Sequence, residues 1–158
     1  MTTIHLIRHA KAKNRLEWTE PDELRPLTKR GRREADAIAE RLLADPPGRL
    51  VSSPYLRCIQ TLEPLSAALD VPIETTDVLV EGAGGERALE LLLSLADGGS
   101  VACCAHGDVA YGVARLVELG GVALGGPAAV SVASTWELAV EAGRVVGARF
   151  VAQPPRDR

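Results

Sequence analysis

Short apolar runs alternate along the chain with longer segments in which apolar residues recur every three or four positions. Short runs of this kind predict buried strands, and the longer periodic segments predict helices that are apolar on one side. Alternation of the two is typical of an α/β domain with a mostly parallel sheet. Strands are expected at residues 3–8, 49–53, 71–80 and 100–105, helices from residues 28, 54, 86 and 107, and a terminal hairpin at residues 130–140 and 145–151.

Capping and breaking residues indicate where several of these elements begin or end. Thr28 is suited to cap the first helix, and Ser53 followed by Pro54 is the residue order that commonly starts a helix. Pro64 predicts a kink or a restart within the helix that follows. Residues 9–27 are polar and contain two prolines, so we expect a long loop, and loops of this length are usually functional.

The length and the composition limit the organisation and the partners of the chain. A chain of 158 residues is expected to form one domain, here residues 1–152, with residues 153–158 as a C-terminal tail. Its formal net charge of −3 gives no overall attraction to nucleic acid or to a membrane, so neither is expected as a partner. Three cysteines, no signal peptide and no membrane-spanning apolar stretch predict a cytoplasmic protein with free thiols.

Basic side chains follow three of the expected strands at their carboxyl ends. Arg8 and His9 end the first strand, Arg57 lies one turn after the second, and His106 ends the strand at residues 100–105. Ligands of open α/β sheets bind at this edge of the sheet. Two arginines and two histidines there predict a local anion pocket in a chain that is acidic overall.

These residue types suit the transfer of a phosphoryl group. Arginines stay charged and match phosphate oxygens, while a neutral histidine can attack phosphorus and form a phosphohistidine. This chemistry needs no metal ion and no cofactor, but it needs a carboxylic acid to protonate a leaving alkoxide. His5 and His9 would lie ~13 Å apart along a strand, too far to share a metal ion, so we expect His5 to be structural.

Three segments resemble the signatures of the histidine phosphatase superfamily, which is phosphoglycerate mutase-like. Residues 7–10, Ile-Arg-His-Ala, are similar to its Arg-His-Gly signature, with Ala10 in place of the usual glycine. Residues 52–61 are similar to its Ser-Ser-Pro-x-x-Arg-x-x-Gln-Thr segment, and residues 105–107 to its second-histidine motif. The resemblance covers nearly the whole chain and implies a three-layer α/β/α domain with a mostly parallel sheet.

Further segments are similar to two groups within this family. Residues 25–31, which begin Arg-Pro-Leu-Thr, resemble the small SixA-type phosphohistidine phosphatases, and so does the short length of the chain. Residues 57–71 and 134–136 resemble the histidine phosphatase domain that is fused to Nudix hydrolases in actinobacteria.

The resemblance implies a role for each matching residue. It implies His9 as the nucleophile, and the phosphate-binding residues that it implies are Arg8, Arg57 and His106, with His106 also in the catalytic set. Glu81 is in the place of the family's catalytic glutamate, and Asp108 is the alternative proton donor. If the substrate is itself a phosphohistidine, its imidazole leaves easily and a strong acid is dispensable.

The expected function is therefore that of a metal-independent phosphatase with a phosphohistidine intermediate on His9. A protein phosphohistidine is the favoured substrate, because a short chain has little material for a lid over a small molecule. Two alternatives stay open: a phosphatase of small phosphomonoesters or nucleotides, and a non-catalytic phosphate-binding module. A phosphoglycerate mutase is less favoured, since mutases of this family are longer.

Overall fold

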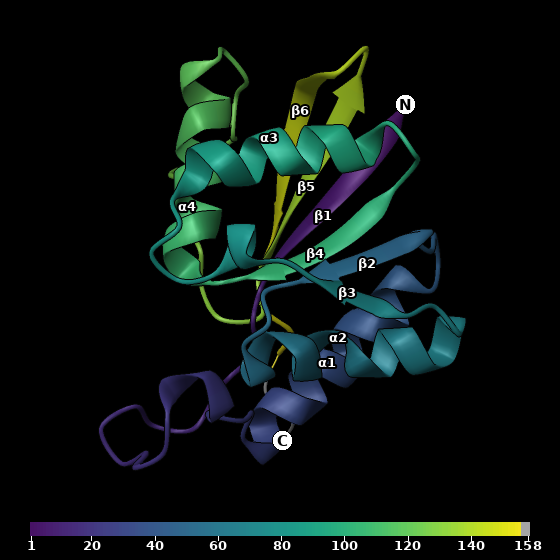
Figure 1. Ribbon diagram of the computed structural model, residues 1–158. Helices are drawn as coiled ribbons and strands as arrows, with labels where there is room; N and C mark the ends of the chain where they lie inside the picture. Colours follow the sequence, from purple (N-terminus) through teal and green to yellow (C-terminus); the bar gives the residue numbers. More distant parts are fainter. Residues whose placement is uncertain (156–158) are drawn as a thin grey trace.

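The computed structural model describes residues 1–155 and consists of a six-stranded sheet between two layers of helices (Figure 1). The strands are β1 (Thr2–Arg8), β2 (Arg49–Ser52), β3 (Ile73–Thr75), β4 (Val101–Ala105), β5 (Thr135–Glu141) and β6 (Arg144–Val151). The helices are α1 (Lys29–Leu42), α2 (Leu56–Leu69), α3 (Gly85–Ala96) and α4 (Gly107–Leu119), with 3-10 helices η1 (Asp22–Leu24) and η2 (Asp77–Leu79). None of the helices described is long and apolar enough to cross a membrane. Residues 156–158 of the predicted tail lie outside the described residues.

The sheet has the strand order β3-β2-β4-β1-β5-β6. The first four of these strands are parallel, and β5 and β6 are antiparallel to their neighbours. Side chains of β1 alternate between the two faces: Ile4 and Leu6 pack with α3 and α4, and Ile7 packs with α1 and α2. The predicted α/β fold with helices on both faces of a mostly parallel sheet is thus confirmed. The predicted free thiols, Cys58, Cys103 and Cys104, are all buried.

The region around α2 differs from the prediction in two respects. The N-cap of α2 is Tyr55, so the predicted cap at Ser53 is wrong. The hydroxyl oxygen of Ser53 accepts the N–H of Tyr55 at 3.3 Å, one residue before the helix begins, and it also lies 2.9 Å from Nε2 of His106. The helix also runs through Pro64 without a restart.

Two predicted strands are shorter in the structure than in the hydrophobic pattern. Of residues 71–80, only β3 is a strand, because the side chain of Thr76 accepts from the backbone N–H of Val78 and starts η2. The first hairpin strand begins at Thr135 and not at residue 130, because the N–H of Ser134 bonds the carbonyl of Ser131 in a turn.

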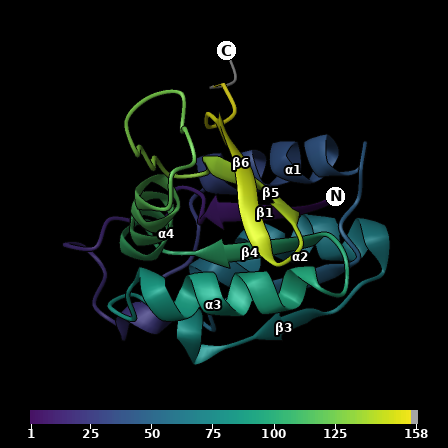
Figure 2. The ribbon, with the colours of Figure 1, turned by 90° about the horizontal axis from the view of Figure 1, so that it is seen from above.

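The carboxyl ends of β2, β4 and β1 are adjacent in the sheet, and Figure 2 shows β1 and β4 running in the same direction toward α4. The loop after β1 is fastened to the start of α1, where Thr28 is the predicted N-cap and accepts from the N–H of Gly31. A Cβ at Gly31 would lie 2.1 Å from the carbonyl oxygen of Lys11, so only glycine permits this approach. Glu34 accepts the N–H of Lys11 at 2.9 Å. The fold thereby fixes the first residues of the loop beside the strand ends.

Candidate active site

His9 follows β1 and is buried, with 7% of its surface exposed. Its Nδ1 lies 2.8 Å from the carbonyl oxygen of Ala10. Because a carbonyl oxygen can only accept, Nδ1 carries the ring proton and Nε2 carries the lone pair. His9 therefore has the tautomer that a nucleophilic Nε2 requires.

The surroundings of His9 keep its ring neutral. Burial lowers the pKa of His9 to about 3; the bond to the carbonyl of Ala10 opposes this shift, and the nearby charges of Arg57, His106 and Arg8 add to it. An imidazole with such a pKa is unprotonated at neutral pH, so its lone pair is available for attack on phosphorus.

Arg8, the last residue of β1, lies beside the first turn of α4. Its Nη1 donates to the carbonyl of Val130 at 2.8 Å, which holds the guanidinium in place. A Cβ at Gly107 would lie 3.0 Å from the guanidinium carbon of Arg8, so the glycine after His106 allows the two strand ends to approach closely. The sequence motif around His106 thus has a packing reason as well as a chemical one.

Arg57 lies in the first turn of α2 and is fully buried. Its Nη1 donates to the backbone carbonyl of Asp22 at 2.9 Å, and its Nη2 donates to the Asp22 carboxylate at 3.0 Å. Oε2 of Glu81 lies 3.9 Å from the same Nη2. The ring of Tyr55 lies 5.0 Å from the guanidinium.

His106 lies directly after β4 and is also fully buried. Its Nε2 lies 2.9 Å from the hydroxyl of Ser53, and its ring centroid lies 5.6 Å from that of His9. Nδ1 of His106 is therefore the ring nitrogen left for a ligand. The contact between Ser53 and this ring cannot be predicted from the sequence, because Ser53 followed by Pro54 is also the residue order of a helix start.

The three predicted phosphate-binding residues share one feature. Nε of Arg8, Nε of Arg57 and Nδ1 of His106 are buried and have no hydrogen-bond partner among residues 1–155. Buried polar groups in proteins are almost always hydrogen-bonded, so three such nitrogens around one nucleophile fit the oxygens of a phosphoryl group. The structure thus brings Arg8, His9, Arg57 and His106 together at one edge of the sheet.

A cavity of about 320 Å³ opens from His9 toward the loop after β1. Its lining includes five cationic side chains and one carboxylate, that of Glu81; the cations are Arg8, Lys11, Lys13, Arg15 and Arg25. A cavity with this charge attracts polyanions. The sequence assigns no role to Lys13 and Arg15, because loop residues have no periodicity that would place them.

The two candidate proton donors are in different positions. Glu81 lines the cavity and pairs with Nη2 of Arg15 at 2.9 Å. Asp108, in the first turn of α4, accepts the N–H of Gly82 at 2.7 Å. Asp108 therefore holds the loop that carries Glu81, and of the two candidates Glu81 is the one that lines the cavity together with His9.

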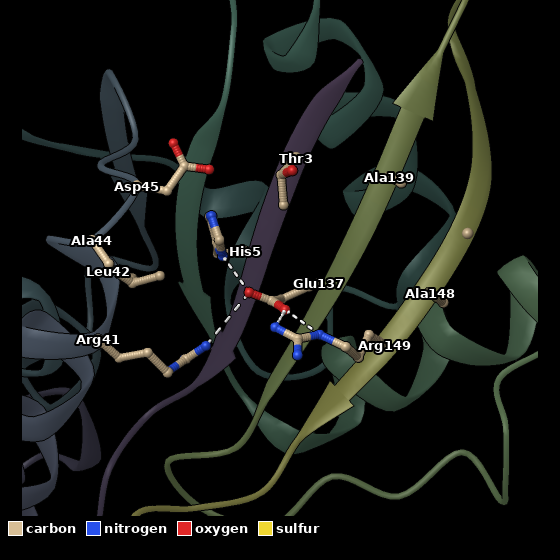
Figure 3. Close-up of a pocket in the computed structure, with 11 residues that line it drawn as sticks. Thr3, His5, Arg41, Leu42, Ala44, Asp45, Glu137, Ala139, Ala148 and Arg149 are labelled. Carbon is tan, nitrogen blue, oxygen red and sulfur yellow. Dashed lines mark hydrogen bonds and ion pairs between the residues drawn. The ribbon is translucent and has the colours of Figure 1, made fainter.

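A larger cavity, of about 500 Å³, lies away from these residues on the face of β1, β5 and β6 next to the end of α1 (Figure 3). Within it Glu137 binds Arg149, and its second oxygen lies 3.4 Å from Nδ1 of His5 and 3.6 Å from Nη1 of Arg41. Glu137 thus pairs with Arg41 and Arg149 within the protein, while burial lowers the pKa of His5 and neither ring nitrogen of His5 has a hydrogen-bond partner among the described residues. No residue implied in phosphoryl transfer lines this cavity among the residues described.

Solved structures resemble this fold over nearly its full length. The protein histidine phosphatase SixA complexed with tungstate is 24% identical, with a TM-score of 0.74, and the match covers 96% of this chain and 95% of that chain. YhfR of Bacillus stearothermophilus is 20% identical, with a TM-score of 0.73, and covers 92% of this chain and 94% of that chain. At these identities the likeness shows the fold alone.

Sequence similarity identifies the family. An 8-oxo-(d)GTP phosphatase of Mycolicibacterium smegmatis is 32% identical over 164 residues, which cover 96% of this chain and 48% of the relative. The chain thus spans about half the length of this curated relative. Residues 4–87 match the histidine phosphatase superfamily (branch 1). Together with the histidines and arginines at the strand ends, this match shows that the chain belongs to the histidine phosphatase superfamily, branch 1.

Proposed function

We propose that this protein is a phosphatase that transfers a phosphoryl group from its substrate to Nε2 of His9 and then to water. The observation that carries the proposal is the neutral His9, with its proton on Nδ1, beside three buried side-chain nitrogens that have no hydrogen-bond partner among residues 1–155. A non-catalytic phosphate-binding module would have no need for a nucleophilic tautomer.

In the first step, Nε2 of His9 attacks phosphorus, the N–P bond forms and the bond to the leaving oxygen breaks. Arg8, Arg57 and His106 donate hydrogen bonds to the phosphoryl oxygens, whose charge these donors stabilise in the transition state. Glu81, which lines the cavity, is the residue that gives a proton to the leaving oxygen. The bond from Nδ1 to the carbonyl of Ala10 keeps the ring in line and stabilises its positive charge while it carries phosphorus.

In the second step, water attacks the phosphohistidine and the N–P bond breaks. The Glu81 carboxylate accepts a proton from this water, which restores the acid for the next cycle. Inorganic phosphate leaves, and His9 returns to its neutral form. Neither step uses an oxidant, a reductant or a second substrate.

For the substrate, we propose a nucleoside phosphate with more than one phosphate group. Arg8, Arg57 and His106 suffice for a single phosphoryl group. Lys11 and Lys13 also line the cavity and form no ion pair within residues 1–155; Nζ of Lys13 lies 5.9 Å from the centre of the Trp18 ring. Their charges fit a second phosphate. The relative that is an 8-oxo-(d)GTP phosphatase supports a nucleotide.

A protein phosphohistidine is the second candidate. The fold likeness to SixA and a cavity that is open to solvent favour it, because a side chain on another protein must reach His9. The two candidates differ at Lys11 and Lys13: a nucleotide with more than one phosphate places a second phosphate against these lysines, whereas a phosphohistidine has a single phosphoryl group.

One comparison tests the proposal. Phosphate release is measured from nucleoside di- and triphosphates, including their 8-oxoguanine forms, from sugar phosphates and from a phosphohistidine-bearing protein. We expect the highest kcat/KM for a nucleotide, and an acid-labile, alkali-stable phosphoenzyme that His9→Ala abolishes. Lys11→Ala and Lys13→Ala should raise KM for nucleotides and leave KM for an aryl monophosphate unchanged. Turnover of the phosphohistidine protein alone would refute the nucleotide, and absence of any phosphoenzyme and turnover would refute the phosphatase.

A further inference from the structure

The buried guanidinium of Arg57 is held by one residue of the loop after β1. Both outer nitrogens of Arg57 bond Asp22, one through the backbone carbonyl at 2.9 Å and the other through the carboxylate at 3.0 Å. A buried arginine needs such partners, because an uncompensated charge away from water is costly. Nε of Arg57 remains without a partner among residues 1–155.

Asp22 is itself fixed by a second arginine. Nε of Arg25 donates to Oδ1 of Asp22 at 2.9 Å, and Nη1 of Arg25 donates to the carbonyl of Lys13 at 2.7 Å. Arg25 is 6% exposed, so its position is set by packing. Partial burial opposes ionisation of Asp22, but hydrogen bonds from Arg25 and Arg57 outweigh it and lower the pKa of the carboxyl. Asp22 is therefore a charged and immobilised acceptor at neutral pH.

We propose that Asp22, held by Arg25, is a positioning residue that orients Arg57 for the phosphoryl group. The proposal rests on the phosphatase function proposed above. It gives a role to the Arg25-Pro26-Leu27-Thr28 segment, which none of the catalytic steps uses. Arg25 holds the carboxylate of Asp22, and Asp22 holds the guanidinium of Arg57 at the phosphate site.

The geometry distinguishes positioning from blocking. A carboxylate that merely occupied the place of the substrate would have to leave Arg57 before phosphate could bind. Asp22 instead bonds the outer nitrogens with one backbone and one side-chain oxygen, and it leaves Nε–H for a phosphoryl oxygen. Removal of the carboxylate should therefore weaken oxyanion binding, whereas removal of a blocking group would strengthen it.

Tungstate binding by calorimetry and hydrolysis of an aryl phosphate test the proposal on the full chain. Asp22→Ala should weaken tungstate binding about tenfold and raise KM by a similar factor, the effect of one charge-assisted hydrogen bond. Asp22→Asn keeps an acceptor oxygen and should recover part of the affinity. Glu23→Ala removes an exposed carboxylate from the same 3-10 helix and should leave both values unchanged.

A double variant separates positioning from a general loss of structure. With Arg57→Lys already present, Asp22→Ala should cause no further loss of tungstate affinity, because the fork that it orients is gone. Equal losses of tungstate affinity in both backgrounds would overturn the proposal. Tighter tungstate binding by Asp22→Ala would also overturn it. So would unchanged tungstate binding by an Asp22→Ala protein that keeps the wild-type melting temperature. If the wild-type protein itself neither binds tungstate nor hydrolyses the aryl phosphate, the phosphatase function fails, and the inference fails with it.

Discussion

The neutral state of buried His9 should be visible in the pH dependence of folding stability. The pKa of His9 is about 3 in the folded protein against 6.5 for a free side chain. Between these values the unfolded chain binds a proton that the folded chain does not bind. Stability is therefore fully present above pH 6.5 and falls as the pH is lowered toward 3. From pH 7.5 to pH 5 this one group removes about 2 kcal/mol from the free energy of unfolding.

The variant His9→Gln keeps a polar side chain and removes the titration. Urea unfolding of both proteins at several values between pH 7.5 and pH 5 gives the difference in pH dependence, in which the contributions of His5 and the carboxylates cancel. We expect the stability of the wild type to fall by about 2 kcal/mol more than that of the variant. Parallel curves, within about 0.5 kcal/mol, would refute the neutral buried His9. Nitrogen NMR should also show the proton of His9 on Nδ1 at pH 6.

Three further changes test other parts of the structure. Gly31→Ala should destabilise the fold by about 1–3 kcal/mol in thermal unfolding, since its Cβ would meet a carbonyl oxygen at 2.1 Å, while Gly48→Ala, with open space around it, is the control. Glu81→Gln should slow aryl phosphates with poor leaving groups far more than those with good ones; equal slowing would assign proton donation elsewhere. Asp108→Ala, which frees the N–H of Gly82, should lower kcat by about tenfold with the same leaving-group dependence, and an unchanged kcat would show that this bond is not needed to place Glu81.

The site residues at the strand ends could be predicted from the sequence, because both the hydrophobic pattern and the residue types point to them. Arg8, His9 and His106 each follow an apolar run, so the hydrophobic pattern places them at the carboxyl edge of the sheet and their residue types indicate an anion. Arg57 follows from its place one turn after the second strand. The catalytic roles of these residues stay predictions, although the structure brings them together.

Contacts that depend on loops could not be predicted in the same way. Asp22 lies in a segment without hydrophobic periodicity, so nothing in the sequence indicates that it meets Arg57. Ser53 has the residue type of a helix cap, and only the fold shows that its hydroxyl is beside His106. The expected strand at residues 71–80 is short because the side chain of Thr76 accepts from the N–H of Val78 and starts η2, a contact that the hydrophobic pattern does not indicate.

Residues 130–133 give the site an unusual dependence on the late part of the chain. Val130 accepts from the guanidinium of Arg8, and the N–H of Ala133 bonds the carbonyls of Arg8 and His9. Arg8 and His9, at the end of β1, are therefore held by a segment more than 120 residues later in the chain. A chain that ends before this segment still contains His9, Arg57 and His106, but it lacks the carbonyl that holds the guanidinium of Arg8, so we expect it to bind phosphate more weakly.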